Sequence, residues 1–392
     1  MSKAIKVLAL FLSALMLTSC GAGLSEGGQS VELFAVNVGK GDALIVKVDG
    51  FTCLIDAGKP YAMGKVRSAL EAMGVSALDA VFLTHTDGDH AGGLEWLSEG
   101  DIPVGAWYAS GYFTDVKAEK HPAVKAAQAR GAQVQWLVRG DSVALGDTGA
   151  ALRVLAPDRL FEDKDDNNSL VMMLETAQGR MLLTGDMELP EEAALLSQGD
   201  DLGCAVLKAP NHGDDDTVSQ AFAEAVSAQA AIISTDSGEK PGTPDPGVVA
   251  RLQSAGAACY VTQDAGLGLR VTLTGGVPSV QAVDIDAPLT TGLTIREVVP
   301  GDDLVTLKND GADADLTGFY LYSDRGNELY AFPEGYVLGA GESVTVGTKS
   351  SDDGDYDLLW NDKKVIHKSK TDDIYLYDAC GRVIDMMSNG HQ

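Results

Sequence analysis

The chain has 392 residues and a formal net charge of -28 at pH 7, from 57 acidic and 29 basic side chains. So large an acidic excess favours solubility and argues against salt-driven binding to polyanions such as nucleic acids. The length is enough for two domains that each bury a core. After Cys20 only four cysteines remain, without a C-x-x-C pair. That usage indicates neither a zinc ribbon nor a disulfide scaffold, and it leaves a single disulfide open.

The first twenty residues are typical of an export leader. Lys3 and Lys6 precede an apolar run over 7–16, and Leu17-Thr18-Ser19-Cys20-Gly21 resembles a lipobox. About ten apolar residues are too few to cross a bilayer, so the pattern predicts a bacterial signal peptide. We expect a lipoprotein signal peptide over 1–20, lipidation of Cys20 and a Gly- and Ser-rich tether over 21–30. The protein is then an exported lipoprotein, anchored by its lipid to the outer face of the cytoplasmic membrane.

The region after the tether alternates between strand and helix patterns. Hydrophobic periodicity predicts strands at 31–38, 42–48, 51–55, 80–83, 133–138, 151–155, 170–174, 181–183, 205–208, 230–234 and 258–261. It predicts helices at 65–73, 123–129, 190–196, 220–227 and 246–254. This order predicts an α/β domain over residues 31–286.

The helical patterns end near Asp286-Ala287-Pro288, where we place a domain boundary. Short alternating strands are expected at 304–307, 318–322, 328–332, 343–346 and 374–377, between clusters of turn residues. Residues 288–388 are therefore predicted to form a small all-β sandwich.

Four potential metal ligands follow the predicted strand 80–83 within six residues: His85, Asp87, Asp89 and His90. Imidazole and carboxylate together suit a divalent cation, and this spacing can turn side chains of one loop toward two adjacent positions. The alternative is a solvated loop with capping aspartates. The strand before the cluster and the Gly-Gly pair after it favour a two-metal hydrolase site.

Three further polar loops adjoin predicted strands. They are Asn167-Asn168-Ser169, Thr184-Gly185-Asp186 and Ala209-Pro210-Asn211-His212-Gly213. Asp186 and His212 could be ordinary turn residues, but their order along the chain favours ligands. His121, His367 and His391 lie outside any motif, and we expect them on the surface.

These motifs, together with residues 34–43 and Ile55-Asp56-Ala57-Gly58, resemble the metallo-β-lactamase superfamily, and specifically its ComEC-like competence-protein branch. That branch has H-x-D-x-D-H where the wider superfamily has H-x-H-x-D-H, and Asp87 occupies the variant position. The resemblance spans about residues 31–285. It implies an αβ/βα sandwich with two divalent metal ions, zinc or manganese, at one edge.

The resemblance also implies a role for each ligand. His85 and Asp87 would hold the first metal, Asp89 and His90 the second, Asp186 would bridge the two, and His212 would complete the second site. Asn168 or Ser169 falls where the wider superfamily has a further histidine, so the first site is expected to be poor in ligands. More carboxylate and less imidazole weakens a preference for zinc. The implied catalytic residues are Asp89, Asp186, His212 and Asn168.

Two positions depart from the family pattern. Family members usually carry His-His-Gly-Ser and, later, Gly-His-Pro, whereas this chain has Asn211-His212-Gly213-Asp214 and Gly242-Thr243-Pro244. The missing histidines are candidate acids or transition-state contacts, not necessarily metal ligands. The motifs therefore support metal binding better than they support turnover.

The C-terminal segment resembles a lamin-tail domain, which is an immunoglobulin-like β-sandwich. The residues that carry this resemblance are 297–299, 303–309, 316–321, 330–333 and 338–342. It implies contact with a surface polymer or a protein, and it names no catalytic residue.

The resemblances imply a surface-anchored, metal-dependent phosphodiesterase or nuclease that uses a metal-activated bridging water, with extracellular DNA as a candidate substrate. A first alternative is a phosphoester hydrolase that acts on wall or lipid polymers, such as a phosphorylcholine esterase, because the acidic surface disfavours DNA. A second alternative is a catalytically weak surface-binding module. Asp87 and the Thr-Gly-Asp context argue against β-lactam hydrolysis.

Overall fold

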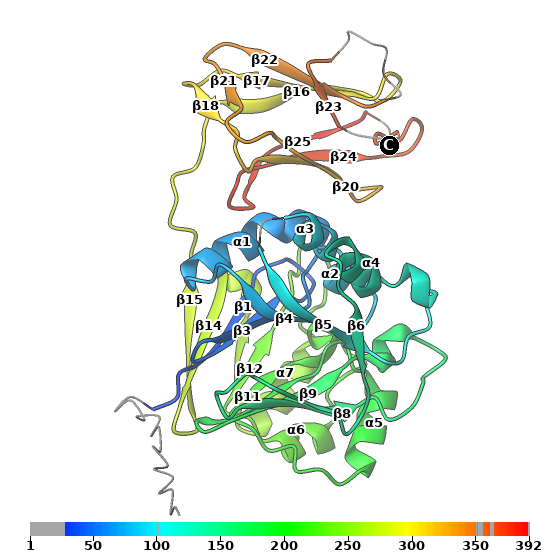
Figure 1. Ribbon diagram of the computed structural model, residues 1–392, viewed down its shortest axis with the longest axis vertical. Coiled ribbons are helices and arrows are strands. Elements are labelled where there is room, and N and C mark those ends of the chain that lie inside the picture. Colours follow the sequence, from blue (N-terminus) through cyan, green and yellow to red (C-terminus); the bar gives the residue numbers. More distant parts are fainter. Residues whose placement is uncertain (1–27, 101, 350, 352–355, 361–363, 391–392) are drawn as a thin grey trace, which may run out of the picture.

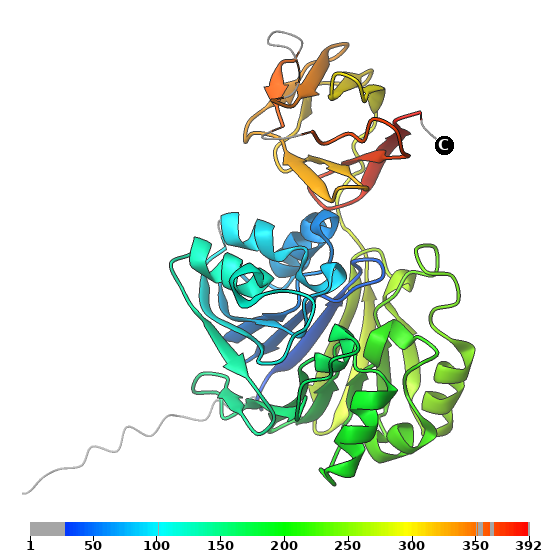
Figure 2. The same ribbon diagram turned by 90° about the vertical axis from the view of Figure 1, so that its right-hand side faces the viewer.

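The computed structural model describes residues 28–100, 102–349, 351, 356–360 and 364–390. Two β-sheets pack face to face in the larger domain, helices cover both outer faces, and a smaller all-β domain stands above one layer of helices (Figure 1, Figure 2). The predicted signal peptide, Cys20 and most of the tether lie outside the described residues.

The first sheet has the strand order β15-β14-β1-β2-β3-β4-β5-β6. Its strands are β1 (Val31–Val36), β2 (Leu44–Val48), β3 (Phe51–Ile55), β4 (Leu78–Leu83), β5 (Val104–Ser110), β6 (Val134–Leu137), β14 (Gly268–Thr274) and β15 (Val277–Val283). The strands from β3 to β6 are parallel. The outer face carries α1 (Met63–Ala72), α3 (Leu94–Glu99) and α4 (Pro122–Ala129).

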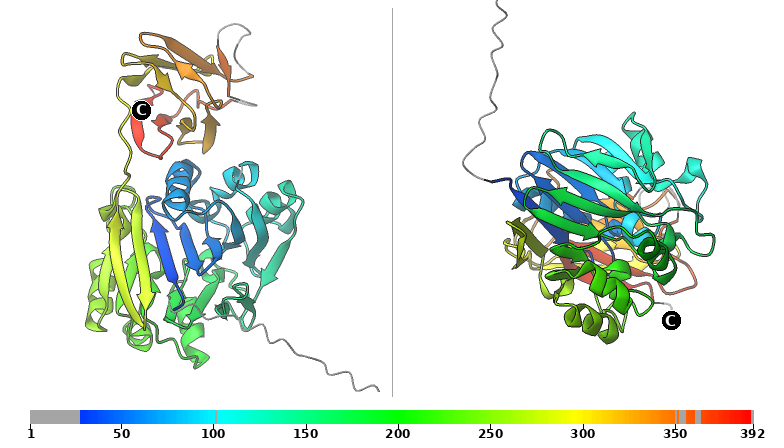
Figure 3. Two further views of the ribbon diagram at one scale, coloured as in Figure 1. Left: turned by 60° about the vertical axis from the view of Figure 1, so that its left-hand side comes forward. Right: turned by 90° about the horizontal axis from the view of Figure 1, so that it is seen from below.

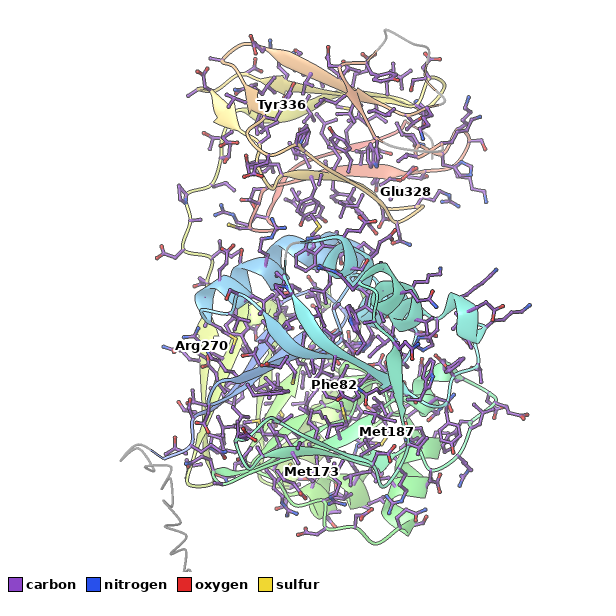
Figure 4. All side chains as sticks on the ribbon, viewed as in Figure 1. Phe82, Met173, Met187, Arg270, Glu328 and Tyr336 are labelled. Atoms are coloured by element: carbon purple, nitrogen blue, oxygen red, sulfur yellow. The ribbon has the colours of Figure 1, made fainter. Side chains whose placement is uncertain are left out.

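The second sheet has the order β13-β12-β11-β10-β9-β8-β7. Its strands are β7 (Ser142–Ala144), β8 (Ala151–Ala156), β9 (Val171–Thr176), β10 (Gly179–Leu183), β11 (Val206–Lys208), β12 (Ala230–Ile233) and β13 (Ala258–Val261). The outer face packs against α5 (Leu189–Ser197), α6 (Gln220–Val226) and α7 (Pro246–Ser254). Met173 and Met187, both labelled in Figure 4, belong to this outer core.

Strand β4 shows how the sequence builds these layers. Ala80 and Phe82 pack in the core between the sheets, while Val81 and Leu83 pack under the helices. Successive strand residues point to opposite faces, so a strand that is covered on both sides reads as a continuous apolar run. The polar loop that follows β4 therefore begins at a sheet edge.

The smaller domain is a β-sandwich. One sheet has the order β16-β17-β22-β23 and the other β20-β19-β24-β25, beside the pair β18-β21. The strands are β16 (Leu293–Val299), β17 (Leu304–Asn309), β18 (Ala314–Asp315), β19 (Tyr320–Ser323), β20 (Glu328–Ala331), β21 (Val337–Leu338), β22 (Ser343–Gly347), β23 (Leu358–Leu359), β24 (Asp373–Tyr377) and β25 (Val383–Ser388). Its core includes Leu307, Phe332 and Trp360.

The sandwich stands over α1, as Figure 3 also shows. It contacts the larger domain at α1 and at the short helix η1 (Pro60–Ala62). Tyr320 Oη donates a hydrogen bond to Tyr61 O at 2.5 Å, and the rings of Tyr61 and Tyr377 stack with centroids 5.8 Å apart. A Cβ on Gly64 would lie 2.5 Å from Gly381 N. The two domains therefore approach at backbone distance.

Among the described residues, neither a disulfide nor a membrane-spanning helix contributes to this architecture. Within the described part of the chain, Cys53, Cys204, Cys259 and Cys380 are free thiols. No helix among the described residues is long and apolar enough to cross a bilayer.

Candidate metal centre

The loop after β4 is fixed by Asp56, which follows β3. Its carboxylate accepts hydrogen bonds from the backbone N–H and the hydroxyl of Thr84, at 2.8 and 2.7 Å. The next residue is His85, and the chain then turns into the short helix α2 (Gly88–Ala91), for which Asp87 is the N-terminal cap position. This local structure places the H-x-D-x-D-H side chains at one edge of the sheet.

One cluster of ligands gathers around Asp186. Its Oδ1 lies 3.1 Å from His90 Nε2 and its Oδ2 lies 3.0 Å from His212 Nε2. The two Nε2 atoms are 3.3 Å apart, and all three side chains are buried. The structure thus brings together three residues that are more than twenty positions apart in the sequence.

The other nitrogen of each ring is already engaged. His90 Nδ1 lies 2.8 Å from Asp56 Oδ2, and His212 Nδ1 lies 2.7 Å from Ser234 O. Such a partner fixes the orientation of the ring and leaves Nε2 directed at the cluster, which is the arrangement of metal-binding histidines. Sequence reasoning did not assign this role to Asp56.

Opposite charges face each other in this cluster. Burial lowers the pKa of His90, but Asp186 and Asp56 outweigh it and hold that pKa well above its usual value. Burial raises the pKa of Asp186, but His212 and His90 hold it well below its usual value. The site stabilises an ionised carboxylate beside imidazole, and a divalent cation would displace the imidazole protons on binding.

Asp42 and Asp89 flank this cluster, each beside a lysine. Asp42 Oδ2 lies 2.6 Å from the buried Lys208 Nζ, and Asp89 Oδ2 lies 2.5 Å from Lys40 Nζ and 3.6 Å from His212 Nε2. Asp42, His90, Asp186 and His212 can each offer one ligand atom within 4.8 Å of the others. Asp42 lies in a motif that was recognised in the sequence, but it was not predicted as a ligand.

A second cluster comprises His85, Asp87 and Asp166, whose ligand atoms also lie within 4.8 Å of one another. His85 Nε2 is buried, has no hydrogen-bond partner among the described residues, and lies 4.0 Å from Asp166 Oδ1. A buried ring nitrogen without a partner is costly, so this atom fits a metal ligand. The ring centroids of His85 and His90 are 4.2 Å apart, so the two clusters are adjacent.

The first site was expected to be poor in ligands, and the structure adds a carboxylate, that of Asp166, which the sequence did not predict. Asp166 belongs to the short helix η3 (Asp165–Asn168). Its neighbour Asp165 accepts hydrogen bonds from Thr86 Oγ1 at 2.6 Å and from Thr114 N at 2.8 Å. Asp165 therefore ties η3 to the loop after β4, and the only signal in the sequence was a pair of aspartates ahead of Asn167.

Ser169, and not Asn168, contacts the first cluster. Ser169 Oγ lies 3.3 Å from His85 Nδ1 and accepts from Asp186 N at 3.0 Å. The side chain of Asn168 instead exchanges hydrogen bonds of 2.8 and 2.9 Å with the backbone of Phe161. Asn168 thus shapes the loop, and its catalytic role stays a prediction.

The two residues that depart from the family pattern, Asn211 and Thr243, form hydrogen bonds with neighbouring side chains. Asn211 Nδ2 donates to Glu188 Oε1 at 3.2 Å, and Thr243 Oγ1 lies 2.8 Å from Thr235 Oγ1. Burial raises the pKa of Glu188 to about 7, against the lowering effect of Lys164. Neither Asn211 nor Thr243 offers a titratable group to the site.

The expectation that His121 is a surface residue is wrong. Its side chain is buried between Phe113 and Trp136, with ring centroids at 4.8 and 5.0 Å. These aromatic residues come from separate loops and strands, so local sequence gives no sign of the burial. His367 is half-buried on a loop of the sandwich, and His391 lies outside the described residues.

The fold and these two clusters define a class, an αβ/βα sandwich with adjacent sites for divalent cations at one edge. Residues 36–237 match the family model of the metallo-beta-lactamase superfamily, and the chain belongs to that superfamily, whose members are generally metal-dependent hydrolases. Residues 287–391 match the model of the lamin tail domain. The recognition of both families from the motifs is confirmed.

Curated relatives include competence proteins. The chain is 28% identical over 247 residues to ComE operon protein 3 of Bacillus subtilis (strain 168), a match that covers 58% of this chain and 31% of the relative. It is 28% identical over 201 residues to competence protein ComA of Neisseria gonorrhoeae, covering 51% and 26%. The matched region thus spans about a third or less of the length of these relatives.

Solved structures with a related fold are more distant. The metallo-beta-lactamase fold protein YhfI from Bacillus subtilis matches with 10% identity and a TM-score of 0.41, over 64% of this chain and all of that one. A diphosphatase from the PhnP family matches with 15% identity and a TM-score of 0.39, over 63% of this chain and 99% of that one.

Proposed function

We propose that the protein is a metal-dependent phosphodiesterase. The observation that carries this proposal is the pair of adjacent clusters, in which buried Nε2 atoms of His85, His90 and His212 face carboxylates. Divalent cations held there would supply Lewis acidity for a phosphoryl group and lower the pKa of water. Zinc and manganese both fit donor sets that mix imidazole with carboxylate.

The residues of the chain orient and balance this chemistry. Asp56 and Ser234 hold the rings of His90 and His212 in place, and Lys40 places a cation at the rim, beside Asp89. Hydrolysis consumes one water: its hydroxyl joins phosphorus, the bond from phosphorus to the leaving oxygen breaks, and the remaining proton goes to that oxygen. Both products, an alcohol and a phosphomonoester, are then accounted for.

The test uses metal-loaded full chain and bis(p-nitrophenyl) phosphate, a substrate without a biological recognition group. Asp186→Asn should lower both bound metal, measured by mass spectrometry, and turnover, the latter by at least about 100-fold. The control is Asp200→Asn, because Asp200 pairs with Arg139 and Arg153 outside both clusters. If Asp186→Asn retained full metal content and turnover, the proposed centre would be wrong.

The choice of phosphodiester separates two candidates. The resemblance of the motifs to the ComEC-like branch implies a nuclease, with extracellular DNA as a candidate substrate. The net charge of -28 favours a wall or lipid phosphoester instead, because an acidic surface repels DNA. A third candidate is a binding module with little turnover. The double variant Asn211→His, Thr243→His tests it, because a gain in hydrolysis would show that these two positions limit activity.

We also propose that a lipid on Cys20 anchors the protein to the outer face of the cytoplasmic membrane. The support is the lipobox-like sequence before Gly21. Cys20→Ser should abolish incorporation of radiolabelled palmitate and release the chain from the membrane fraction. Continued labelling of that variant would contradict the proposal.

A further inference from the structure

Two hollows lie along the seam between the domains. One has a volume of about 810 Å³ and is lined at one end by Thr86, Gly88 and Asp89 of the loop that carries the metal ligands. The other has a volume of about 960 Å³, and we call it the tyrosine hollow. Lys59 and Asn327 line both, so the two hollows adjoin each other. Asn327 belongs to the turn between β19 and β20, and the sandwich therefore forms one wall of a space that begins at the loop that carries the metal ligands.

Aromatic rings from both domains line the tyrosine hollow. They are Tyr61, Tyr322, Tyr375 and Tyr377. Tyr322 meets Tyr61 edge-on with centroids 5.2 Å apart, and the centroids of Tyr375 and Tyr377 are 6.1 Å apart. The Lys59 ammonium already lies 5.5 Å from the centroid of Tyr61. Tyr377 is stacked between Tyr61 and Tyr320, and Tyr322 is buried. The half-buried ring of Tyr375 therefore remains to attract a cation.

Carboxylates surround the same hollow. Four lining residues are acidic: Asp236, Glu239, Asp284 and Asp324. Glu239 forms an ion pair with Lys59 and accepts from Tyr61 Oη at 2.7 Å. Within the part of the chain that the structure describes, the other three form no ion pair with a lysine, arginine or histidine.

The basic residues of the lining do not reverse this charge. Arg382 is paired with Asp378 at 2.7 Å. Burial lowers the pKa of the Lys65 ammonium, although Asp236 and Glu239 act against this. A polyanion would find little complementary charge here, whereas a cation finds the ring of Tyr375 together with carboxylates.

We propose that the tyrosine hollow binds an ammonium group, the cationic end of a zwitterionic phosphoester whose phosphate lies at the metal centre. The second half of this statement rests on the proposed phosphodiesterase function, whereas the first half does not. Ligand sites occur preferentially at domain interfaces, where two rigid walls meet. The lamin-tail domain is then part of the substrate site.

Binding is tested without catalysis, on the full chain, by calorimetric titration with choline. Its neutral isostere 3,3-dimethylbutanol has the same shape without the charge, and it should bind at least about fivefold more weakly. Tyr375→Ala should weaken choline binding by about fivefold or more. Asp324→Asn keeps the shape of an exposed turn residue and should also weaken binding.

The matched control is Tyr260→Ala on strand β13, a tyrosine that is 36% exposed and outside the hollow. It should leave choline binding unchanged. Equal affinity for the isostere, no binding of choline, or unchanged binding in both Tyr375→Ala and Asp324→Asn would overturn the proposal.

A hydrolysis assay separates this proposal from the proposed function. p-Nitrophenyl phosphorylcholine should show a lower KM than p-nitrophenyl 3,3-dimethylbutyl phosphate, and Tyr375→Ala should remove the difference. Hydrolysis of bis(p-nitrophenyl) phosphate with equal KM values for the two esters would overturn the substrate assignment and leave the phosphodiesterase intact. Choline binding that depends on Tyr375, without hydrolysis of any ester, would refute the phosphodiesterase and retain the cation site.

Discussion

At the scale of single residues, Asp166 decides what kind of metal site the first cluster is. Its donor set is one imidazole, from His85, and two carboxylates, from Asp87 and Asp166. Oxygen-rich sets suit manganese, whereas added imidazole favours zinc. We predict that Asp166→His raises the ratio of bound zinc to bound manganese by at least about threefold, after dialysis against an excess of manganese over zinc.

The ratio is measured by mass spectrometry, so it does not depend on activity. The same substitution at Asp163 is the control, because Asp163 is exposed on the same loop. Asp163→His should leave the ratio as it is in the unsubstituted chain. An unchanged ratio in Asp166→His would show that Asp166 is not a ligand.

The burial of His121 predicts how the stability of the fold depends on pH. Burial lowers the pKa of His121 to about 4, although Asp165 acts against this. The ordinary pKa of an exposed histidine is about 6.5, so the unfolded chain takes up a proton between these values while the folded chain does not. The contribution of His121 is therefore fully present above about pH 6.5 and is lost as the pH falls toward 4.

We expect urea unfolding to show that the free energy lost between pH 7 and pH 4.5 is smaller in His121→Gln, by about 2 kcal/mol. Comparing the loss of free energy in the two chains cancels the effect of the carboxylates, because both chains contain the same carboxylates. If His121→Gln lost as much free energy of unfolding as the unsubstituted chain, the burial of His121 would not oppose its protonation.

At the scale of elements, buried strands and long helices could be predicted from sequence. Helix α7 and the buried strand β3 have the predicted bounds, because a clear helical period and an apolar run are local signals. The pattern did not predict β5, β14 or β15. Strand β15 exposes Val277 at 62% and turns Pro278 toward its less exposed face, so the order of apolar and polar residues does not mark its two faces.

The candidate site also has one part that could be predicted from the sequence and one part that could not. The H-x-D-x-D-H loop was predictable because its ligands are close in sequence. Asp166 was not, because its approach to His85 depends on how η3 packs against the loop after β4. Lys208 likewise reads as the last residue of an apolar strand, and only the fold pairs it with Asp42.

The turn between β1 and β2 shows how an element can position the metal loop. Gly41 has a φ of 154°, and a Cβ on it would lie 2.5 Å from Asp89 O. Asp42 N also donates to Asp89 O at 3.1 Å. We predict that Gly41→Ala lowers the free energy of unfolding by about 1–3 kcal/mol and weakens metal binding, because Asp89 must move.

Chemical denaturation and metal titration check this prediction. Gly50→Ala is the control, because a Cβ at Gly50 meets no atom within 4 Å. It should change neither quantity appreciably. Wild-type metal affinity in Gly41→Ala would mean that the turn does not position the metal loop.

At the scale of the whole molecule, the interface makes the domains one structural unit. Met63, Tyr320, Tyr322 and Tyr377 form a buried cluster across the seam, and Tyr61 packs against it. Hydrogen bonding and stacking at the same place add directional contacts to the buried apolar surface. A site built between the domains depends on this contact, so its integrity should follow the coupling of the two domains.

Gly64 tests that coupling, since α1 meets the β24–β25 turn there with backbone against backbone. A Cβ on Gly64 would lie 2.5 Å from Gly381 N and 2.8 Å from Gly381 Cα, so Gly64→Val must push the sandwich away from α1. We predict that calorimetry then shows two separated unfolding transitions in place of one, since domains with a lost interface unfold independently. Choline binding should fall with the coupling, because the tyrosine hollow loses one wall. Glu71→Val places the same side chain on an exposed position of α1 and should leave both measurements unchanged. If Gly64→Val kept one transition and full choline binding, the backbone contact would not be what joins the domains.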